Sequence, residues 1–309
     1  MIYPLTLSLY HGEMLLTRSQ CLSFSLDKEI YTPYDSVSAE FLAESVDYSL
    51  ADRIALYHEN TCIFQGLPDE IRQYSKNHSS FVRIKSKSFT SLLLQNELEP
   101  GTHSNLTAES LLTGFYQFPF VTYENLEGSG YIFVKSGNTM WDGVVSFGYK
   151  LTGHYPYVLQ NHICFSPPQN RPVHSFTSSQ MLESGTLLNT AKLISHYHME
   201  DILGNPDGYQ QENTFASGLN IVRHKQIPFD SSFRHDPDSA LTFRNRYSNR
   251  GCRAKYLIYD GFRNETLGDN ISYGTFIQNQ PLCRLHASFG TNGFRTALWC
   301  YQDGFYSQP

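Results

Sequence analysis

The fold is decided around residues 81–93, where the sequence reads FVRIKSKSFTSLL. Between positions 82 and 85 apolar and charged residues alternate, with the period of two that is typical of a half-buried strand. From Phe89 this alternation stops, and small polar residues lead into a pair of leucines, which indicates a short helix. The stretch therefore marks the point where a strand-rich region ends and a mixed region begins.

The residues before this point form a series of short strands with turns between them. The segment Gly66–Asp69 contains glycine and proline and is expected to turn the chain. Strand patterns recur at residues 5–9, 22–26, 37–41, 54–57 and 62–64, the last two as a hairpin. Several period-two strands at short spacing predict a first small β-barrel, or a sandwich, over residues 1–98.

Residues 99–169 combine helix and strand signals. Thr107 is placed to cap one helix, and Asn138 or Thr139 to cap a second helix that Gly153 would end. Strands are expected at residues 118–123, 131–134, 155–159 and 162–165, the last two joined as a hairpin by Gln160-Asn161. These signals predict a small α+β domain.

Residues 170–309 return to strand patterns. Asp236-Pro237 is a good helix start, and the helix is expected over 237–249 with Gly251 as its stop. Residues 203–220 are rich in glycine and polar residues, which predicts a long exposed loop. Strands are expected at 187–199, 254–259, 271–277, 282–289 and 294–301, with Asn292-Gly293 as a hairpin turn.

The predicted fold class is therefore β-rich α+β, with two small β-barrel domains and a small α/β domain between them. A length of 309 residues is sufficient for such an arrangement of two or three domains. Aromatic residues make up 14% of the chain and charged residues only 17%, which argues against a disordered chain. The same composition suits large permanent interfaces.

Charge and hydropathy limit the partners that we expect. The formal net charge is -6, whereas a general nucleic-acid binder is usually basic. We find no apolar run of about 18 residues, so no membrane span is expected. Met1–Tyr10 lacks the pattern of a secretory signal, which predicts that the chain is made in the bacterial cytoplasm.

The common signatures of catalysis are missing from the sequence. We find no nucleotide-binding glycine loop, no G-x-S-x-G elbow and no H-E-x-x-H motif. We therefore predict that the chain is not an enzyme and that it uses no cofactor, and we assign no catalytic, cofactor-binding or metal residue.

Four other residue groups admit a functional interpretation. On a strand, His196, His198 and Glu200 would share one face and could hold zinc, although a solvated polar face gives the same pattern and is preferred. For three further groups we also prefer a structural role to a functional one. They are the carboxylate pairs Asp69/Glu70 and Glu97/Glu99, the basic cluster Arg244, Arg246, Arg250, Arg253 and Lys255, and the cysteines Cys21, Cys62, Cys164, Cys252, Cys283 and Cys300. For the cysteines we expect reduced, buried thiols, with a zinc site or disulfides as the alternative.

Four segments together resemble a known family. The strand at 81–86 passes through small polar residues into Leu92-Leu93, and Thr107–Leu112 and Trp141–Val145 follow as helices. Asn161–Pro168 then provides a strand with a proline exit. This order resembles the central hub proteins of phage tail baseplates and of phage tail-like particles, over about residues 1–170.

The resemblance implies a structural function. Hub proteins of this family form a homotrimer that acts as a symmetry adaptor, joining the sixfold tail tube to the threefold central spike. The partners it implies are other copies of the chain, the tube or tube-initiator protein and the spike, with tape measure and baseplate wedge proteins as further candidates. The location it implies is the baseplate of a virion or of a contractile injection system.

Two alternatives remain open from the sequence. One is a receptor- or glycan-binding tail protein, which exposed aromatic side chains in a single cleft would favour. The other is a tail-associated cell-wall hydrolase, which would need a converging site, for instance around His196 and His198. The short tail Tyr301–Pro309 is a candidate for docking onto the spike.

Overall fold

The computed structural model describes residues 5–229, 236–291 and 293–306. The strand-rich start of the chain contains seven strands: β1 (Leu5–His11), β2 (Met14–Gln20), β3 (Ser23–Glu29), β4 (Ser36–Leu42), β5 (Arg53–His58), β6 (Thr61–Lys76) and β7 (Ser79–Ser88). In β3 and β4 every second residue is buried, as the period of two requires. The predicted hairpin is confirmed as β5 and β6.

The expected turn at Gly66–Asp69 is wrong. These residues lie inside β6, which runs for 16 residues, and the register against β7 shifts between Pro68 and Glu70. Proline cannot donate a ladder hydrogen bond, and an irregularity in the register accommodates it without ending the strand.

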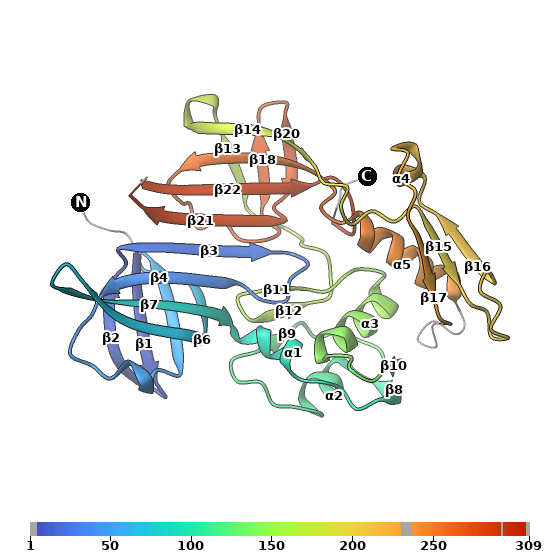
Figure 1. The fold of residues 1–309 in the computed structure, drawn as a ribbon, viewed down its shortest axis with the longest axis horizontal. Coiled ribbons are helices and arrows are strands. Elements are labelled where there is room, and N and C mark those ends of the chain that lie inside the picture. The colour runs from blue at the N-terminus through green and yellow to red at the C-terminus, as the bar shows by residue number, and fades with distance from the viewer. Residues whose placement is uncertain (1–4, 230–235, 292, 307–309) are drawn as a thin grey trace.

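Four strands from the second half extend the same sheet: β14 (Met181–Leu188), β18 (Arg253–Asp260), β21 (Arg284–Gly290) and β22 (Gly293–Tyr301). The sheet has eleven strands in the order β14-β18-β22-β21-β3-β4-β7-β6-β5-β1-β2. It is antiparallel, and Figure 1 shows the red strands β21 and β22 lying beside the blue strand β3. The junction is the pairing of β21 with β3, in which Ala287 lies opposite Leu26.

One hydrophobic core spans both parts of this sheet. It contains Leu26 and Phe41 from the first part and Leu257 and Leu298 from the second. We find no closed barrel among the described strands, so β-rich architecture is confirmed while the layout of two barrels, with its domain limits, stays a prediction. Asn292 of the expected turn lies outside the described residues.

The middle of the chain forms a compact unit with its own core. Its elements are α1 (Leu92–Gln95), β8 (Gly101–Leu106), α2 (Ala108–Thr113), β9 (Thr122–Tyr123), β10 (Gly130–Val134), α3 (Met140–Thr152), β11 (Tyr157–Leu159) and β12 (His162–Cys164). The caps at Thr107 and Thr139 and the left-handed Gly153 are confirmed. The strand expected at 118–123 shortens to β9.

The remaining elements form two small sheets and a helix. One sheet contains β13 (Val173–Phe176), β19 (Asn270–Tyr273) and β20 (Ile277–Pro281), and the other contains β15 (His196–Met199), β16 (Tyr209–Glu212) and β17 (His224–Ile227). The predicted helix is confirmed as α5 (Pro237–Asn249), capped by Asp236. In Figure 1, the β15–β17 sheet lies at the right-hand side of the molecule.

Three predictions for this part are wrong in detail. The expected loop over 203–220 contains β16 and α4 (Thr214–Gly218), so the irregular part before β16 is short. The strand expected over 187–199 is divided between β14 and β15, and that over 271–277 is divided between β19 and β20. β14 stops where its pairing with the distant β18 ends, whereas β19 and β20 pair with each other as a hairpin. None of the described helices is both long and apolar enough to cross a membrane.

Candidate functional site

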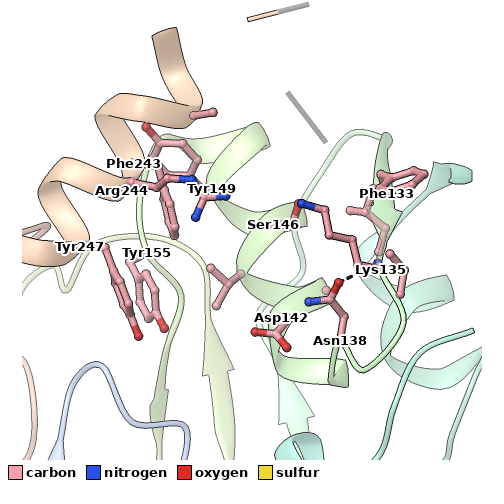
Figure 2. A pocket seen from close by; sticks show the side chains of 15 residues that line it. Phe133, Lys135, Asn138, Asp142, Ser146, Tyr149, Tyr155, Phe243, Arg244 and Tyr247 are labelled. Atoms are coloured by element: carbon pink, nitrogen blue, oxygen red, sulfur yellow. Dashed lines mark hydrogen bonds between the residues drawn. The ribbon is translucent and has the colours of Figure 1, made fainter. Parts of the chain in front are cut away.

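A pocket of about 240 Å³ lies between β10, α3 and α5, and we call it the α3–α5 pocket (Figure 2). Its walls are mainly aromatic and aliphatic side chains from these three elements. The polar and aromatic lining residues described below are Asn138, Asp142, Ser146, Tyr149, Tyr155, Phe243 and Tyr247.

Helix α3 is held in place from both its start and its buried face. Thr139 and Asp142 form a capping box, in which Thr139 N donates to Asp142 Oδ2 at 2.8 Å and Asp142 N donates to Thr139 Oγ1 at 3.2 Å. At Gly143, a Cβ atom would lie 2.3 Å from Leu98 Cδ1. The absence of a side chain there lets the helix pack closely, which fixes one wall of the pocket.

The opposite wall is a group of stacked rings. The rings of Tyr155 and Tyr247 stack with centroids 5.5 Å apart, and those of Tyr149 and Phe243 meet at 4.8 Å. Figure 2 shows Tyr247 on α5 beside Tyr155. Burial raises the pKa of Tyr155 well above its ordinary value, so its hydroxyl stays protonated at neutral pH.

The polar groups of the pocket serve mainly the fold. Asn138 Oδ1 accepts from Lys135 N at 2.7 Å, and Asp142 is engaged in the helix cap. Ser146 Oγ is buried and has no hydrogen-bond partner among the described residues. The pocket therefore offers apolar surface together with the buried Ser146 hydroxyl and the cationic side chains of Lys135 and Arg244.

Three histidines meet on one face of the β15–β17 sheet. The rings of His196 and His224 stack with centroids 4.4 Å apart. His198 Nδ1 lies 2.7 Å from Asp207 Oδ1, and His198 Nε2 lies 2.9 Å from His224 Nδ1. Since a carboxylate only accepts, His198 Nδ1 donates to Asp207.

This arrangement differs from the zinc set considered from the sequence. Glu200 follows the end of β15, where its backbone N donates to Ile227 O at 3.0 Å. Both ring nitrogens of His198 already have partners. Within residues 5–229, 236–291 and 293–306, no three His, Cys, Asp or Glu side chains are placed to hold a metal ion.

A larger cleft, of about 570 Å³, lies over the junction of β3 and β21, and we call it the β3–β21 cleft. Its aromatic lining consists of Tyr31, Tyr34, Tyr247, Trp299 and Tyr301, and its charged lining consists of Asp27, Lys28, Glu29, Lys192, Arg250 and Arg284. Sequence reasoning missed this site, because its residues come from five separate parts of the chain.

The acidic side chains of the cleft already have partners. Asp27 Oδ1 lies 2.8 Å from His286 Nδ1. Glu29 accepts hydrogen bonds from Thr32 Oγ1 at 2.9 Å and from Tyr301 OH at 3.2 Å, while desolvation raises its pKa. Glu29 also feels the charge of Arg250, which opposes the effect of desolvation on its pKa.

The basic side chains are less fully paired. Lys28 is buried against Asp35, with Nζ 3.3 Å from Oδ2. Arg250 lies over the Tyr247 ring and Arg284 over the Trp299 ring, at 3.4 and 4.9 Å from the ring centroids. In the described part of the chain, no carboxylate forms an ion pair with Lys192, Arg250 or Arg284. The cleft therefore favours an anionic occupant that also has apolar surface.

The other residues considered from the sequence are spread over the molecule. Asp69 and Glu70 form surface ion pairs with Lys87 and Lys85. The basic cluster divides, since Arg253 pairs with Asp303 while Lys255 Nζ donates to Phe276 O. The six cysteines are unpaired, and all except the half-buried Cys62 are buried.

The C-terminal tail packs against its own chain. Phe305 and Tyr306 are buried in the core of the middle unit, and Tyr31 OH accepts from Phe305 N at 2.7 Å. These residues are therefore unavailable for the spike docking considered from the sequence. Residues 307–309 lie outside the described part.

Glu124 is a structural residue that sequence reasoning also missed. Its carboxylate accepts from the backbone N of Phe165 at 2.7 Å and of Ser166 at 2.9 Å, which ties β9 to the exit from the middle unit. Glu124 is one acidic residue among many in the sequence, and its pattern contains no signal of this role.

Similar proteins are found when structures are compared but not when sequences are compared. No protein-family model matches the sequence, and no curated protein matches it. Among solved structures, a tail protein from Neisseria meningitidis MC58 aligns with a TM-score of 0.72 at 13% identity, covering 98% of each chain. The 43 kDa tail protein of prophage MuSo2 from Shewanella oneidensis aligns with a TM-score of 0.70 at 9% identity, covering 96% of this chain and 98% of that one.

A third similar structure comes from a related kind of particle. It is an E. coli component of the type VI secretion system, which itself has structural similarity to the T4 tail proteins gp27 and gp5. It aligns with a TM-score of 0.54 at 9% identity, covering 94% of this chain and 76% of that one. The likenesses confirm the resemblance indicated by the sequence: this chain has the fold of phage tail and baseplate hub-like proteins.

Proposed function

We propose that this chain is a structural baseplate hub, which forms a homotrimer joining the sixfold tail tube to the threefold central spike. The observation that carries the proposal is the likeness to the Neisseria meningitidis tail protein over 98% of both chains. The match extends over nearly the full length of both chains, so it concerns the overall fold and not a single domain. The likeness to the type VI secretion component supports placing the chain near a tube and a spike.

The proposed role is one of assembly and not of bond-making chemistry. The neighbours are tail and secretion-particle components. The proposed location is the baseplate of a virion or tail-like particle, after assembly in the bacterial cytoplasm. The proposed partners are further copies of the chain, the tube or tube-initiator protein and the spike, with tape measure and wedge proteins as additional candidates.

The mass of the native particle tests the trimer. Light scattering over a concentration series is expected to give three times the chain mass of 35.4 kDa. Electron microscopy of that particle is expected to show a ring with pseudo-sixfold symmetry. A mass of one chain at all concentrations, both alone and mixed with purified tube and spike proteins, would contradict the trimeric hub.

A further inference from the structure

We infer that the loop after β15 in one copy of this chain docks into the β3–β21 cleft of the next copy. The loop comprises residues 200–208 and reads EDILGNPDG. The inference rests on the proposed self-association and adds to it a specific contact, made by two different surfaces of the chain.

The loop presents two apolar side chains to solvent. Ile202 is 71% exposed and Leu203 is 84% exposed, although they are adjacent and at the tip of a turn. In Figure 1 this loop is the free end between β15 and β16, far from the eleven-stranded sheet. Two adjacent apolar side chains on a projecting tip form a continuous exposed surface that binding to a partner would remove from water.

The loop is held rigid by its own hydrogen bonds. Asp201 Oδ1 accepts from Leu203 N at 2.8 Å and from Asn205 N at 2.9 Å, and Asn205 Nδ2 donates to Asp201 Oδ2 at 2.6 Å. At Gly208 a Cβ atom would lie only 2.4 Å from Asp201 Cβ, so the two arms of the loop are in contact. A loop that is already ordered loses little conformational entropy on binding.

The charges of the loop and the cleft are complementary. The loop contains Glu200, Asp201 and Asp207 and no basic residue; Asp207 also accepts from His198 and Asp201 from groups of the loop itself, so the loop keeps a net negative charge. The cleft presents Lys192 and Arg284, for which no ion pair with a carboxylate is found among the described residues, and Arg250, which interacts electrostatically with Glu29. Opposite charges of this kind steer association and fix its register.

The shapes and polarity also agree. The cleft has a volume of about 570 Å³, large enough for two aliphatic side chains, and its aromatic lining offers apolar surface to Ile202 and Leu203. Loop and cleft belong to different surfaces of the chain, so the contact is heterologous. A heterologous contact forms a ring when its rotation closes after three copies, which is what the proposed trimer requires.

Charge exchange tests the contact. We expect Lys192→Glu/Arg284→Glu in the cleft and Glu200→Lys/Asp207→Lys in the loop each to weaken self-association about tenfold or more. The variant that combines all four substitutions is expected to recover most of the lost affinity, because the opposite charges again face each other. Sedimentation equilibrium measures the affinity, and circular dichroism verifies that each variant is folded.

Further variants test whether the apolar side chain at the tip of the loop is needed for the contact, and whether its position on the chain matters. Leu203→Asp is expected to weaken self-association about tenfold. Val222→Asp is the control, since Val222 is also 80% exposed and lies before β17 on the same small sheet. Arg72→Glu on β6 is the control for charge reversal outside the cleft. The controls are expected to leave the affinity unchanged.

A cross-link then identifies the two surfaces directly. A Leu203→Cys copy mixed with a Lys192→Cys copy is expected to give a disulfide-linked pair under mild oxidation, whereas Val222→Cys in place of Leu203→Cys is not. The docking is contradicted if the trimer forms with unchanged affinity in the loop and cleft variants, and this result leaves the proposed hub intact. A wild-type mass of one chain contradicts both proposals. The wild type can also form a dimer or a larger ring. If the loop and cleft variants dissociate that assembly and the combined charge exchange restores it, the docking is supported and the trimer is contradicted.

Discussion

Lys28 and Asp35 form an ion pair inside the molecule, with side chains only 3% and 7% exposed. Lys28 Nζ also donates to Ile63 O at 3.0 Å, which links β3 to β6. Removing one member of a buried pair leaves an uncompensated charge in a poorly solvated place. This pair therefore contributes to stability chiefly through the cost of leaving either partner alone.

Replacement of Lys28 tests this description. We expect Lys28→Met to lower the free energy of unfolding by about 3–5 kcal/mol, and Lys28→Met/Asp35→Leu to lower it by less. Lys85→Met is the matched control, because Lys85 pairs with Glu70 on the surface and its loss is expected to cost about 1 kcal/mol at most. Urea unfolding measures all three. A loss for Lys28→Met as small as that of the control would contradict the prediction.

The contact of His174 with Asp269 leads to a prediction about how the stability of the protein depends on pH. Its Nε2 lies 3.0 Å from the buried Asp269 Oδ2, and this hydrogen bond raises the pKa of His174 above its ordinary value of 6.5. A raised pKa in the folded state adds stability that is fully present below the unfolded-state pKa. That stability is lost as the pH rises through the folded-state pKa.

We therefore expect the stability difference between the wild type and His174→Asn to be largest below about pH 6.5 and to shrink at higher pH. Thermal unfolding of both proteins across a pH series measures it. His78→Asn, at an exposed position, controls for the loss of a histidine. A difference that grows with pH would show that the sign is wrong.

At the scale of elements, the helix α3 depends on glycine for close packing. A Cβ atom at Gly148 would lie 2.6 Å from Pro156 Cγ and 2.7 Å from Phe165 Cδ1. Alanine normally stabilises a helix relative to glycine by about 1 kcal/mol. Here the gain is opposed by overpacking against the strand segment that follows the helix, which costs about 1–3 kcal/mol.

Gly148→Ala is therefore expected to destabilise the protein, by up to about 2 kcal/mol after both effects. Gly218→Ala in α4 is the matched control, because no atom lies within 4 Å of the added Cβ, and it is expected to be neutral or stabilising. Chemical denaturation compares the two variants. Equal effects at both positions would mean that packing around α3 is looser than the structure indicates.

At the scale of the whole molecule, the eleven-stranded sheet joins the two ends of the chain. Without β21, strand β3 would expose an unpaired edge together with part of the hydrophobic core. Exposed strand edges pair with other chains. We therefore expect residues 1–98 expressed alone to aggregate, and coexpression with residues 170–309 to reduce that aggregation.

Solubility and size-exclusion chromatography measure this effect. Coexpression with residues 170–309 carrying Ala287→Asp provides the control, since Ala287 lies opposite Leu26 in the junction and is fully buried. This variant is expected to give no recovery. If residues 1–98 alone form a stable monomer with a cooperative unfolding transition, the first region is an independent barrel, as the sequence analysis predicts.

Sequence reasoning succeeded where the relevant interactions are local. Helix α5 has its predicted limits because Asp236 caps it and Pro237 suits its first turn, and both signals lie next to the helix they start. The same holds for Thr139 at the start of α3 and Gly153 at its end. The candidate functional sites lacked such signals, since the β3–β21 cleft gathers residues from distant segments.

The sequence by itself determined the β-rich class, the capped helices and the resemblance to tail hub proteins. These depend on periodicity and on contacts within a few residues, which the order of side chains specifies directly. Only the tertiary structure decided that β3 pairs with β21, that Asp35 neutralises Lys28 in the interior, and that α4 and β16 interrupt the expected loop. The physical reason is that strand edges offer the same backbone donors and acceptors whatever their sequence, so the choice of partner depends on how the whole chain buries its apolar surface.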